Sequence, residues 1–370
     1  MGSGPTSMES GVPRVVLLSQ RHIRPWVSRL LGYEFERVIG ELTDPFWAVP
    51  EQPRVGRMPE VLVNRLNKRL KVASSLKAPF PRIDIPDADL LVAVMQLPAD
   101  LTTLAALPGW RSRCTKAVVY IEEMWSVELD KWKGHLALLD QFDHVFLGSQ
   151  GTVAELAARI DTPVSYLPYG VDTTVFAPAD PRRDRPIAVT NIGRRSPVTH
   201  QALLDWAAAG DHFYYHDTFS PGPFHDAEEH RRLLANIMQR TQVAIANRGI
   251  GVRPHETGYQ EEVGFRFFEA AAGGALLVGQ PPNSGAAHEL FDWEDALIEV
   301  DFAEPDIGAM LDELLADPDR ITAAHVRNRR YAIERHDHLH RFQAMCDAAG
   351  VDAGPLAAAR RAVLADLAAV

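Results

Sequence analysis

The stretch EEVGFRFFEAAAGGALLVG, residues 261–279, contains acidic positions, a helical pattern and a short apolar run in immediate succession. Phe265, Phe268 and Ala272 are spaced i, i+3 and i+7, which predicts a helix from about Gly264 that buries this face. The glycine pair that follows predicts the end of the helix, because glycine tolerates the left-handed conformation of a C-cap. The run ALLVG then predicts a strand, so the stretch indicates part of an open α/β sheet.

Acidic residues flank the start of this predicted helix. Glu261 and Glu262 lie in the loop before it, and Glu269 falls in its second turn. Loops at the carboxyl ends of strands bind ligands in open α/β sheets, and the free amides of a helix N-terminus attract phosphate. Two carboxylates would repel a phosphate unless they face hydroxyl groups on either side of it. A sugar, a diphosphate and a ribose in that order satisfy this geometry, which indicates a nucleotide sugar.

Short β-branched and aliphatic runs alternate with helical patterns along the rest of the chain. Such runs are typical of strands in a parallel sheet that is buried on both faces. The predicted strands are residues 14–20, 89–95, 116–122, 143–149, 162–168, 187–193, 212–216, 243–249, 274–280 and 295–301. Helical spacing between successive strands indicates βαβ units.

A segment rich in proline and mixed charge, residues 169–186, separates two groups of these runs and predicts an interdomain linker. From about residue 320 the chain becomes helical and rich in Arg and His. The predicted organisation is a disordered leader 1–11, an N-terminal Rossmann-like domain 12–168, the linker, a C-terminal Rossmann-like domain 187–335 and C-terminal helices 336–370.

Composition excludes several classes of protein. The chain has 370 residues and a net charge of -11, so it lacks the basic footprint of a nucleic-acid-binding protein. Its 2 cysteines exclude a disulfide scaffold and favour a reducing compartment. The first ten residues lack the pattern of a signal peptide, and the most apolar window is far shorter than the roughly 20 residues of a membrane helix. We therefore expect a cytoplasmic protein with no transmembrane segment.

Three segments together resemble one family. The pattern E-x7-E from Glu261 to Glu269, followed by GGALLVG, resembles the donor site of GT-B glycosyltransferases. It is most similar to the retaining family 4 and to relatives with a glycosyl transferases group 1 C-terminal domain, in particular their spore-maturation-type branch. Residues 168–178, PYGVDTTVFAP, resemble the family's interdomain segment, and residues 187–196, IAVTNIGRRS, resemble its strand-Gly-Arg segment.

The resemblance implies a GT-B fold, in which two Rossmann-like α/β domains face each other across a cleft and a C-terminal helix packs back on the first domain. The N-terminal domain would present the acceptor and the C-terminal domain would bind a nucleoside-diphosphate sugar. Glu269 would bind the ribose hydroxyls and Glu261 the sugar hydroxyls, while Arg194, next to Gly193, would contact the diphosphate together with helix-terminal amides. Glu261 and Arg194 are the predicted catalytic residues.

Further donor-side residues follow from the same comparison. Glu262 is the alternative to Glu261 because it is displaced by one position, and Gly264 lies at the junction of loop and helix. Arg266 either reaches the phosphate or extends into solvent. Without a ligand, these acids would be ordinary residues near a helix N-terminus, where the dipole favours negative charge.

One departure from the family concerns a lysine expected about five residues after Arg194. Thr199 occupies that position. Arg195, His200 or Arg253 would have to replace the lysine, or the grip on the phosphate would be weaker.

On the acceptor side, His22 follows the first predicted strand, and Glu122 and Glu123 end another. Each is also explained as a solvated residue at a strand end. The segment HDHLH, residues 336–340, would place His336 and His340 on one helix face, but without a third ligand we favour a polar helix over a metal site. We likewise interpret the basic run at 64–71 as a solvated helix face.

The predicted activity is hexosyl transfer from a nucleoside-diphosphate sugar to an acceptor hydroxyl. The resemblance implies retention at the anomeric carbon, with no metal or other cofactor. Two alternatives stay open: another reaction on the same fold, such as sugar-nucleotide epimerisation or formation of a non-glycosidic bond, and a degenerate protein that binds nucleotide sugars without turnover. The acceptor, the sugar and the base are not predicted.

Overall fold

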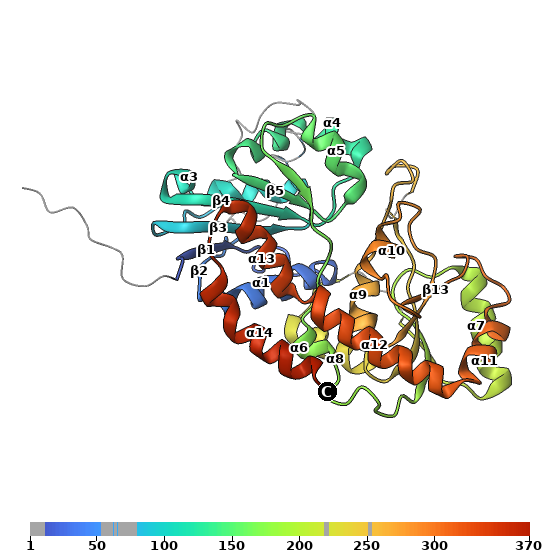
Figure 1. The fold of residues 1–370 in the computed structure, drawn as a ribbon. Helices are drawn as coiled ribbons and strands as arrows, with labels where there is room; N and C mark the ends of the chain where they lie inside the picture. Colours follow the sequence, from blue (N-terminus) through green and yellow to red (C-terminus); the bar gives the residue numbers. More distant parts are fainter. Residues whose placement is uncertain (1–11, 53–61, 63–64, 66–79, 218–221, 251–253) are drawn as a thin grey trace, which may run out of the picture.

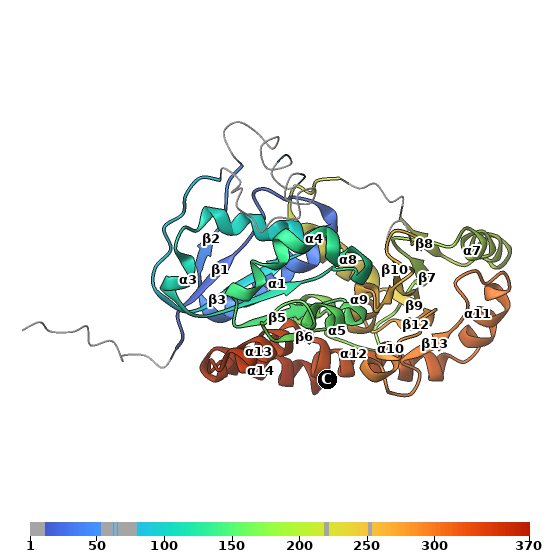
Figure 2. The same ribbon diagram turned by 90° about the horizontal axis from the view of Figure 1, so that it is seen from above.

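The computed structural model describes residues 12–52, 62, 65, 80–217, 222–250 and 254–370. The predicted leader, Arg253 and most of the basic run at 64–71 lie outside these residues. The chain forms two parallel sheets that lie side by side (Figures 1 and 2).

The N-terminal sheet has six strands in the order β2-β1-β3-β4-β5-β6, and all neighbouring strands are parallel. Its strands are β1 (Val15–Leu18), β2 (Phe46–Ala48), β3 (Ala88–Met95), β4 (Cys114–Ile121), β5 (His144–Leu147) and β6 (Val164–Tyr166). Strand β2 was not predicted, because its apolar run is short and lies in a part of the sequence that is rich in proline and charge. Both faces of the sheet are covered, since successive residues of β4 such as Val118 and Val119 belong to different core clusters.

The C-terminal sheet has five parallel strands in the order β13-β12-β9-β7-β8. They are β7 (Ile187–Asn191), β8 (Tyr214–His216), β9 (Thr241–Ile245), β12 (Leu276–Gly279) and β13 (Leu297–Glu299). A separate antiparallel pair joins β10 (Gly249–Ile250) to β11 (Glu261–Glu262). The α/β architecture and the GT-B arrangement of two Rossmann-like halves are therefore confirmed.

Helices cover both sheets. The longer ones are α1 (Leu30–Thr43), α4 (Leu129–Leu136), α7 (Pro197–Gly210), α8 (Ala227–Met238), α9 (Phe265–Ala272), α11 (Ile307–Leu315), α12 (Pro318–His336), α13 (His338–Ala349) and α14 (Gly354–Ala368). The shorter ones are α3 (Trp110–Arg113), α5 (Val153–Ala157), α6 (Thr173–Phe176) and α10 (Ala286–Leu290). Short 3-10 helices include η1 (Val27–Arg29), η2 (Pro98–Ala106), η3 (Ser126–Glu128), η4 (Leu139–Gln141) and η5 (Gln150–Thr152).

The C-terminal helices return to the first sheet, as predicted. In Figure 1, α12 leads from the C-terminal sheet to α13 and α14, which lie with α1 below the N-terminal sheet, opposite α4 and α5. Phe342 of α13 and Leu364 of α14 share a core cluster with β-strand residues such as Val92. About 25 cal/mol is gained per Å² of apolar surface removed from water, so this packing fastens the chain end to the first domain.

Two local predictions were wrong. Phe268 and Ala272 are fully buried, but Phe265 is 40% exposed. It lies at the start of α9 beside Tyr169 of the interdomain segment and outside the core. His336 and His340 do not share a helix face, because α12 ends at His336 and α13 begins two residues later. The side chain of Asp337 caps the second helix by accepting the amide N–H of Leu339.

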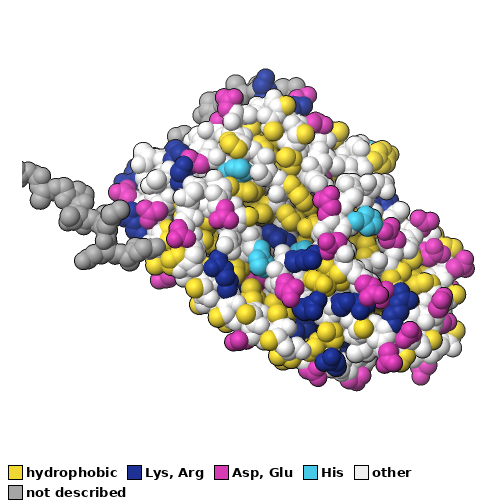
Figure 3. All heavy atoms as spheres, in the orientation of Figure 1, with side chains coloured by type: hydrophobic (Ala, Val, Ile, Leu, Met, Phe, Trp, Pro, Cys, Tyr) yellow, Lys and Arg dark blue, Asp and Glu magenta, His cyan; other side chains and the backbone are white. Residues whose placement is uncertain are grey.

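The surface along α12 is mixed in charge. Figure 3 shows basic side chains gathered over this face. Arg327 and Arg335 form ion pairs with Asp295 and Asp292, respectively, so acids are interleaved with them. In the part of the chain that is described, no helix combines the length and the hydropathy that crossing a bilayer requires.

Candidate functional site

Four of the predicted donor-side residues lie at the carboxyl edge of the C-terminal sheet: Gly193, Arg194, Gly264 and Arg266. Gly193 and Arg194 follow β7, and Gly264 caps the N-terminus of α9. Gly193 has a φ of +94°, and a Cβ atom there would lie 3.9 Å from Nη2 of Arg266. The loop after β7 and the first turn of α9 are therefore neighbours, as a site for a diphosphate requires.

Glu261 lies on the donor side of β11. Its Oε1 atom is 2.6 Å from Nε of Arg248, and its Oε2 accepts the amide N–H of Asn283 at 3.2 Å. Arg248 lies in the loop after β9 and belongs to no motif that was recognised in the sequence. Its Nη1 atom is buried and has no hydrogen-bond partner among the described residues. A guanidinium with a donor to spare, beside a predicted catalytic acid, is suited to a phosphate oxygen.

Glu262 points away from Glu261, toward the N-terminal domain. Its carboxylate accepts the backbone N–H groups of Gln150 at 2.8 Å and Gly151 at 3.0 Å, at the start of η5. The side chain is buried, and burial raises its pKa, although the hydrogen bonds from Gln260 and from the two amides oppose the shift. In this structure Glu262 therefore joins the domains and does not face the donor edge.

Glu269 is fully buried, and arginines hold both of its carboxylate oxygens. Oε1 pairs with Arg231 of α8, and Oε2 accepts from Nη1 of Arg266 at 2.5 Å. A ribose hydroxyl would have to displace one of these arginines to reach the carboxylate. The predicted role of Glu269 as a ribose ligand thus requires a rearrangement of this cluster.

Arg231 continues the cluster into the N-terminal domain. Its Nε donates to Oε2 of Glu34 in α1 at 2.6 Å, and His338 lies 3.2 Å from the same carboxylate. Burial alone would raise the pKa of Glu34, but the charges and hydrogen bonds of Arg231 and His338 hold it below its ordinary value. One buried series of alternating charges, Glu34, Arg231, Glu269 and Arg266, therefore runs from α1 to the loop at Gly193.

Arg194 is exposed and its Nη1 donates to the carbonyl oxygen of Ile250. Burial raises the pKa of Glu123 in the N-terminal domain, and the side chain of Gln96 and the positive charge of Arg194 partly offset this shift. The structure thus brings Arg194 and Glu123 near each other across the domain boundary.

The other acceptor-side predictions fall at different places. Glu122 is buried beside Gly32 of α1, and burial together with the charge of Glu123 raises its pKa well above the ordinary value. His22 is exposed in the loop after β1 and lines a separate pocket. These two residues do not join the group formed by Arg194 and Glu123.

Two of the residues considered as replacements for the missing lysine, Arg195 and His200, are described by the structure, and both already have a partner. The hydroxyl of Thr199 is bonded to the carbonyl oxygen of Phe302 at 2.7 Å. Arg195 pairs with Asp217 at 2.5 Å, and His200 Nδ1 is 2.8 Å from the hydroxyl of Tyr214. Arg248, described above, is better placed.

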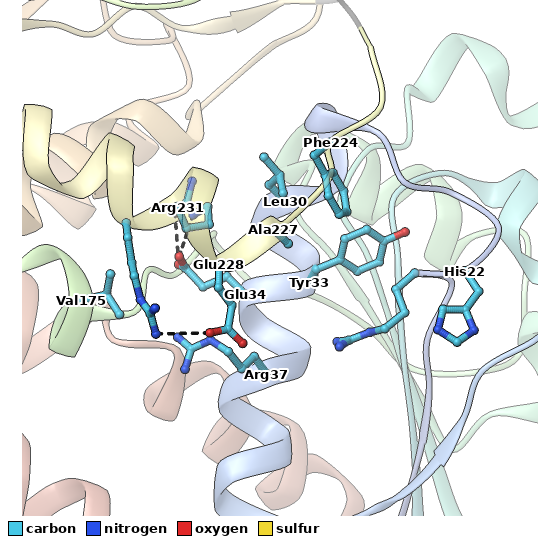
Figure 4. A pocket seen from close by; sticks show the side chains of 12 residues that line it. His22, Leu30, Tyr33, Glu34, Arg37, Val175, Phe224, Ala227, Glu228 and Arg231 are labelled. Carbon is cyan, nitrogen blue, oxygen red and sulfur yellow. Dashed lines mark hydrogen bonds and ion pairs between the residues drawn. The ribbon is translucent and has the colours of Figure 1, made fainter.

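A pocket of about 240 Å³ lies between α1 and α8 (Figure 4). It is lined by Arg21, His22, Leu30, Tyr33, Glu34, Arg37, Val175, Phe224, Ala227, Glu228, Arg231 and Arg232. Arg231 is shared between the wall of this pocket and the buried cluster around Glu269.

Comparison with known proteins identifies relatives of this architecture. Residues 205–347 match the family described as glycosyl transferase-like. Anabaena HepE in complex with UDP-glucose superimposes with a TM-score of 0.53 at 14% sequence identity, over 90% of this chain and 98% of that one. An alpha-glucosyltransferase in complex with UDP-glucose and DNA containing an abasic site gives 0.53 at 11% identity, over 92% of this chain and 100% of that one. A search among curated proteins finds no match. At these identities the structural likeness establishes the fold.

Proposed function

We propose that this chain, which has the GT-B fold and whose residues 205–347 match the glycosyl transferase-like family, transfers a hexosyl group from a nucleoside-diphosphate sugar to an acceptor hydroxyl. The observation that carries the proposal is that three arginines lie at the carboxyl edge of the C-terminal sheet: Arg194 and Arg266 at the loop of Gly193, and Arg248 beside Glu261. Three guanidinium groups and one carboxylate at the same edge match the charge pattern of a diphosphate joined to a polyol.

The arginines would stabilise the leaving group. In the reaction the bond from the anomeric carbon to the diphosphate oxygen breaks, and a bond from that carbon to the acceptor oxygen forms. Negative charge builds up on the departing diphosphate, and fixed donors around it lower the barrier. The departing phosphate oxygen takes the proton of the acceptor hydroxyl, with retention at the anomeric carbon. Arginine side chains supply the positive charge, so we propose that the enzyme requires no metal.

Glutamates would have two different roles. We propose that Glu261, whose carboxylate lies at the donor edge, binds sugar hydroxyls. Glu269 keeps Arg266 beside the loop at Gly193 through its ion pair, and binds a ribose hydroxyl only if one of its arginines moves away.

Nucleotide binding tests this proposal. Thermal unfolding is followed with UDP, GDP, ADP and dTDP, each alone and with a corresponding sugar nucleotide. A ligand at a hundredfold excess over its Kd stabilises the folded state by about 2.7 kcal/mol. We expect stabilisation by nucleotides of one base, and product analysis by NMR then reports the anomeric configuration. Absence of stabilisation by every compound would reject the donor site.

The degenerate alternative makes a different prediction. A protein that only binds the sugar nucleotide would show the thermal shift but release no nucleoside diphosphate with any acceptor. An epimerase would convert the sugar nucleotide without any acceptor at all.

A further inference from the structure

The pocket between α1 and α8 lies where two ligand-binding edges meet. Arg21 and His22 follow the carboxyl end of β1, and Phe224 and Ala227 follow the carboxyl end of β8. In open α/β sheets these ends are the usual location of ligands. Figure 4 shows Tyr33 of α1 close to Phe224 of the segment that leads into α8.

Arg21 is held in a fixed orientation at this pocket. Its Nε donates to Oγ of Ser19 at 3.1 Å and its Nη2 to Oε2 of Glu36 at 3.0 Å. The guanidinium carbon also lies 4.5 Å from the centroid of the Trp47 ring and 5.9 Å from that of Tyr33. The side chain is 35% exposed, and no described residue accepts a hydrogen bond from Nη1. A pre-oriented guanidinium with an open donor is suited to a planar or tetrahedral anion.

The charge of Arg21 is only partly neutralised. Glu36 is its only described ionic partner, and Oε1 of that glutamate is buried without a hydrogen bond. Burial raises the pKa of Glu36 to about 7, against the effect of Arg21, so near neutral pH part of the population carries no charge there. An anionic ligand would complete the neutralisation of Arg21.

The remaining charges of the pocket are arranged differently. Arg231 is bound by Glu34 and Glu269, and Arg37 by Glu41 and Asp172, so these two arginines are matched inside the protein. On the opposite wall, Arg232 is 68% exposed and its distance to Glu228 is 3.3 Å. Arg21 and Arg232 therefore supply the cationic groups that a ligand can reach.

The apolar part of the wall fits a ring. Tyr33 and Phe224 form an edge-to-face pair with centroids 5.9 Å apart, and Leu30 and Ala227 lie beside them. A few placed polar groups on a mostly apolar wall are typical of small-molecule sites. Aromatic faces bind the C–H faces of sugar rings, while arginine and glutamate side chains bind their hydroxyl groups.

We propose that this pocket binds the acceptor, and that the acceptor is a saccharide or polyol with an anionic group, a carboxylate or a phosphate, which pairs with Arg21. The inference rests on the proposed function, because it names the acceptor of that reaction. The pocket is joined to the donor edge through Arg231, Glu269 and Arg266, so acceptor and donor sites share one buried carboxylate.

The test uses the full chain with the sugar nucleotide identified by thermal unfolding. Release of nucleoside diphosphate is measured with glucose, glucuronic acid and glucose 6-phosphate as acceptors, and binding of each is measured by calorimetry in the presence of the nucleoside diphosphate. We expect glucuronic acid or glucose 6-phosphate to bind and to accept, and glucose to bind at least tenfold more weakly. The two acidic compounds distinguish a carboxylate from a phosphate.

Substitutions at two arginines locate the anion. Arg21→Gln should raise the KM for the acidic acceptor about tenfold to a hundredfold, because a charge-assisted hydrogen bond is lost, while Arg21→Lys should restore part of the affinity. Arg232→Gln, an exposed change that leaves the core intact, should give a smaller increase. The matched control is Arg82→Gln, at a side chain that is 67% exposed and outside the pocket.

The outcomes separate the two proposals. If the unmodified protein bound none of the nucleotides, the donor site itself would be rejected. Intact nucleotide binding with no binding of either acidic compound, or with equal binding of glucose, would overturn the acceptor inference alone. The acceptor inference would also be overturned if the Arg21→Gln and Arg82→Gln variants had the same KM for the acidic acceptor.

Discussion

The carboxylate of Glu262 accepts the backbone N–H of Gln150 at 2.8 Å, and this contact joins the C-terminal domain to the N-terminal one. Side chains alternate along a strand, so neighbouring residues of β11 serve opposite sides. Glu261 contacts Arg248 at the donor edge, and Glu262 contacts the other domain. Two adjacent residues therefore contact the carboxyl edge of one sheet and the neighbouring domain.

Glu262→Gln should weaken this contact. A carboxylate that accepts two amide N–H groups is replaced by an amide whose NH₂ group cannot accept, and a hydrogen bond to a charged group contributes about 1.5–3 kcal/mol. We expect a lower free energy of unfolding by roughly this amount and a larger radius of gyration in X-ray scattering. Unchanged scattering and unchanged stability would show that the domains are held together elsewhere.

Gly151→Ala tests the same contact from the other domain. A Cβ atom at this position would lie 3.1 Å from Nε2 of Gln260 and 3.2 Å from Oε1 of Glu262. We expect this variant to show the same expansion in scattering as Glu262→Gln. Gly222→Ala is the matched control, because a Cβ atom there meets nothing within 4 Å. Equal scattering from the two glycine variants would argue against an effect of steric contact.

Apart from β2, the sequence predicted the strands of both sheets, because each of them is a short apolar run between polar loops. The contact between Glu262 and Gln150 could not be predicted, since it depends on how the two sheets are placed. Phe265 was assigned to the core by its spacing, yet it is 40% exposed and its ring lies 6.2 Å from that of Tyr169 in the segment between the two sheets. Periodicity shows that a helix face is apolar, but not which body covers it.

The candidate site was predicted in part for a similar reason. Glu261, Arg194 and Gly193 belong to motifs with fixed spacing, and the fold brings them to one edge. Arg248 lies in a loop with no such motif, and Arg231 reaches Glu269 from a different helix. The sequence did contain one indication of a further cation. Thr199 stands where the resemblance predicts a lysine, so another positively charged side chain is expected near the phosphate.

The buried charge cluster should be sensitive to loss of its central cation. Arg231→Met leaves the carboxylates of Glu34 and Glu269 buried and without their main partner. Breaking a buried ion pair by removal of one partner costs about 3–5 kcal/mol, which we expect as a loss in urea denaturation. Arg232→Ala, next to it on the exposed side of α8, should change stability by less than about 0.5 kcal/mol. A similar small loss in both variants would mean that water already reaches the cluster.

Glu36 should make stability depend on pH. Burial raises its pKa to about 7 in the folded protein, above the ordinary value of 4.5, so between these values the folded state binds more protons than the unfolded state. The free energy of unfolding therefore falls as pH rises through this window, by up to about 3 kcal/mol at 1.36 kcal/mol per pKa unit. Glu36→Gln removes the titrating group and with it this pH dependence. The difference in free energy of unfolding, variant minus unmodified protein, should therefore increase from pH 4.5 to pH 7. A parallel pH profile in urea denaturation would contradict the assignment.

Arg248 should be the cation that replaces the family's lysine. Arg248→Ala removes a guanidinium whose Nη1 atom has no hydrogen-bond partner in the described part of the chain and which lies beside Glu261. Loss of a charge-assisted hydrogen bond to a phosphate predicts a Kd for the nucleoside diphosphate that is roughly tenfold to a hundredfold higher. Calorimetry with the nucleotide that gives the largest thermal shift measures this change. Arg330→Ala is the control, because Arg330 is 47% exposed and pairs with Glu334 of the same helix, α12. The same Kd in both variants would leave Arg194 and Arg266 as the diphosphate ligands, and the buried guanidinium of Arg248 would then serve only to orient Glu261.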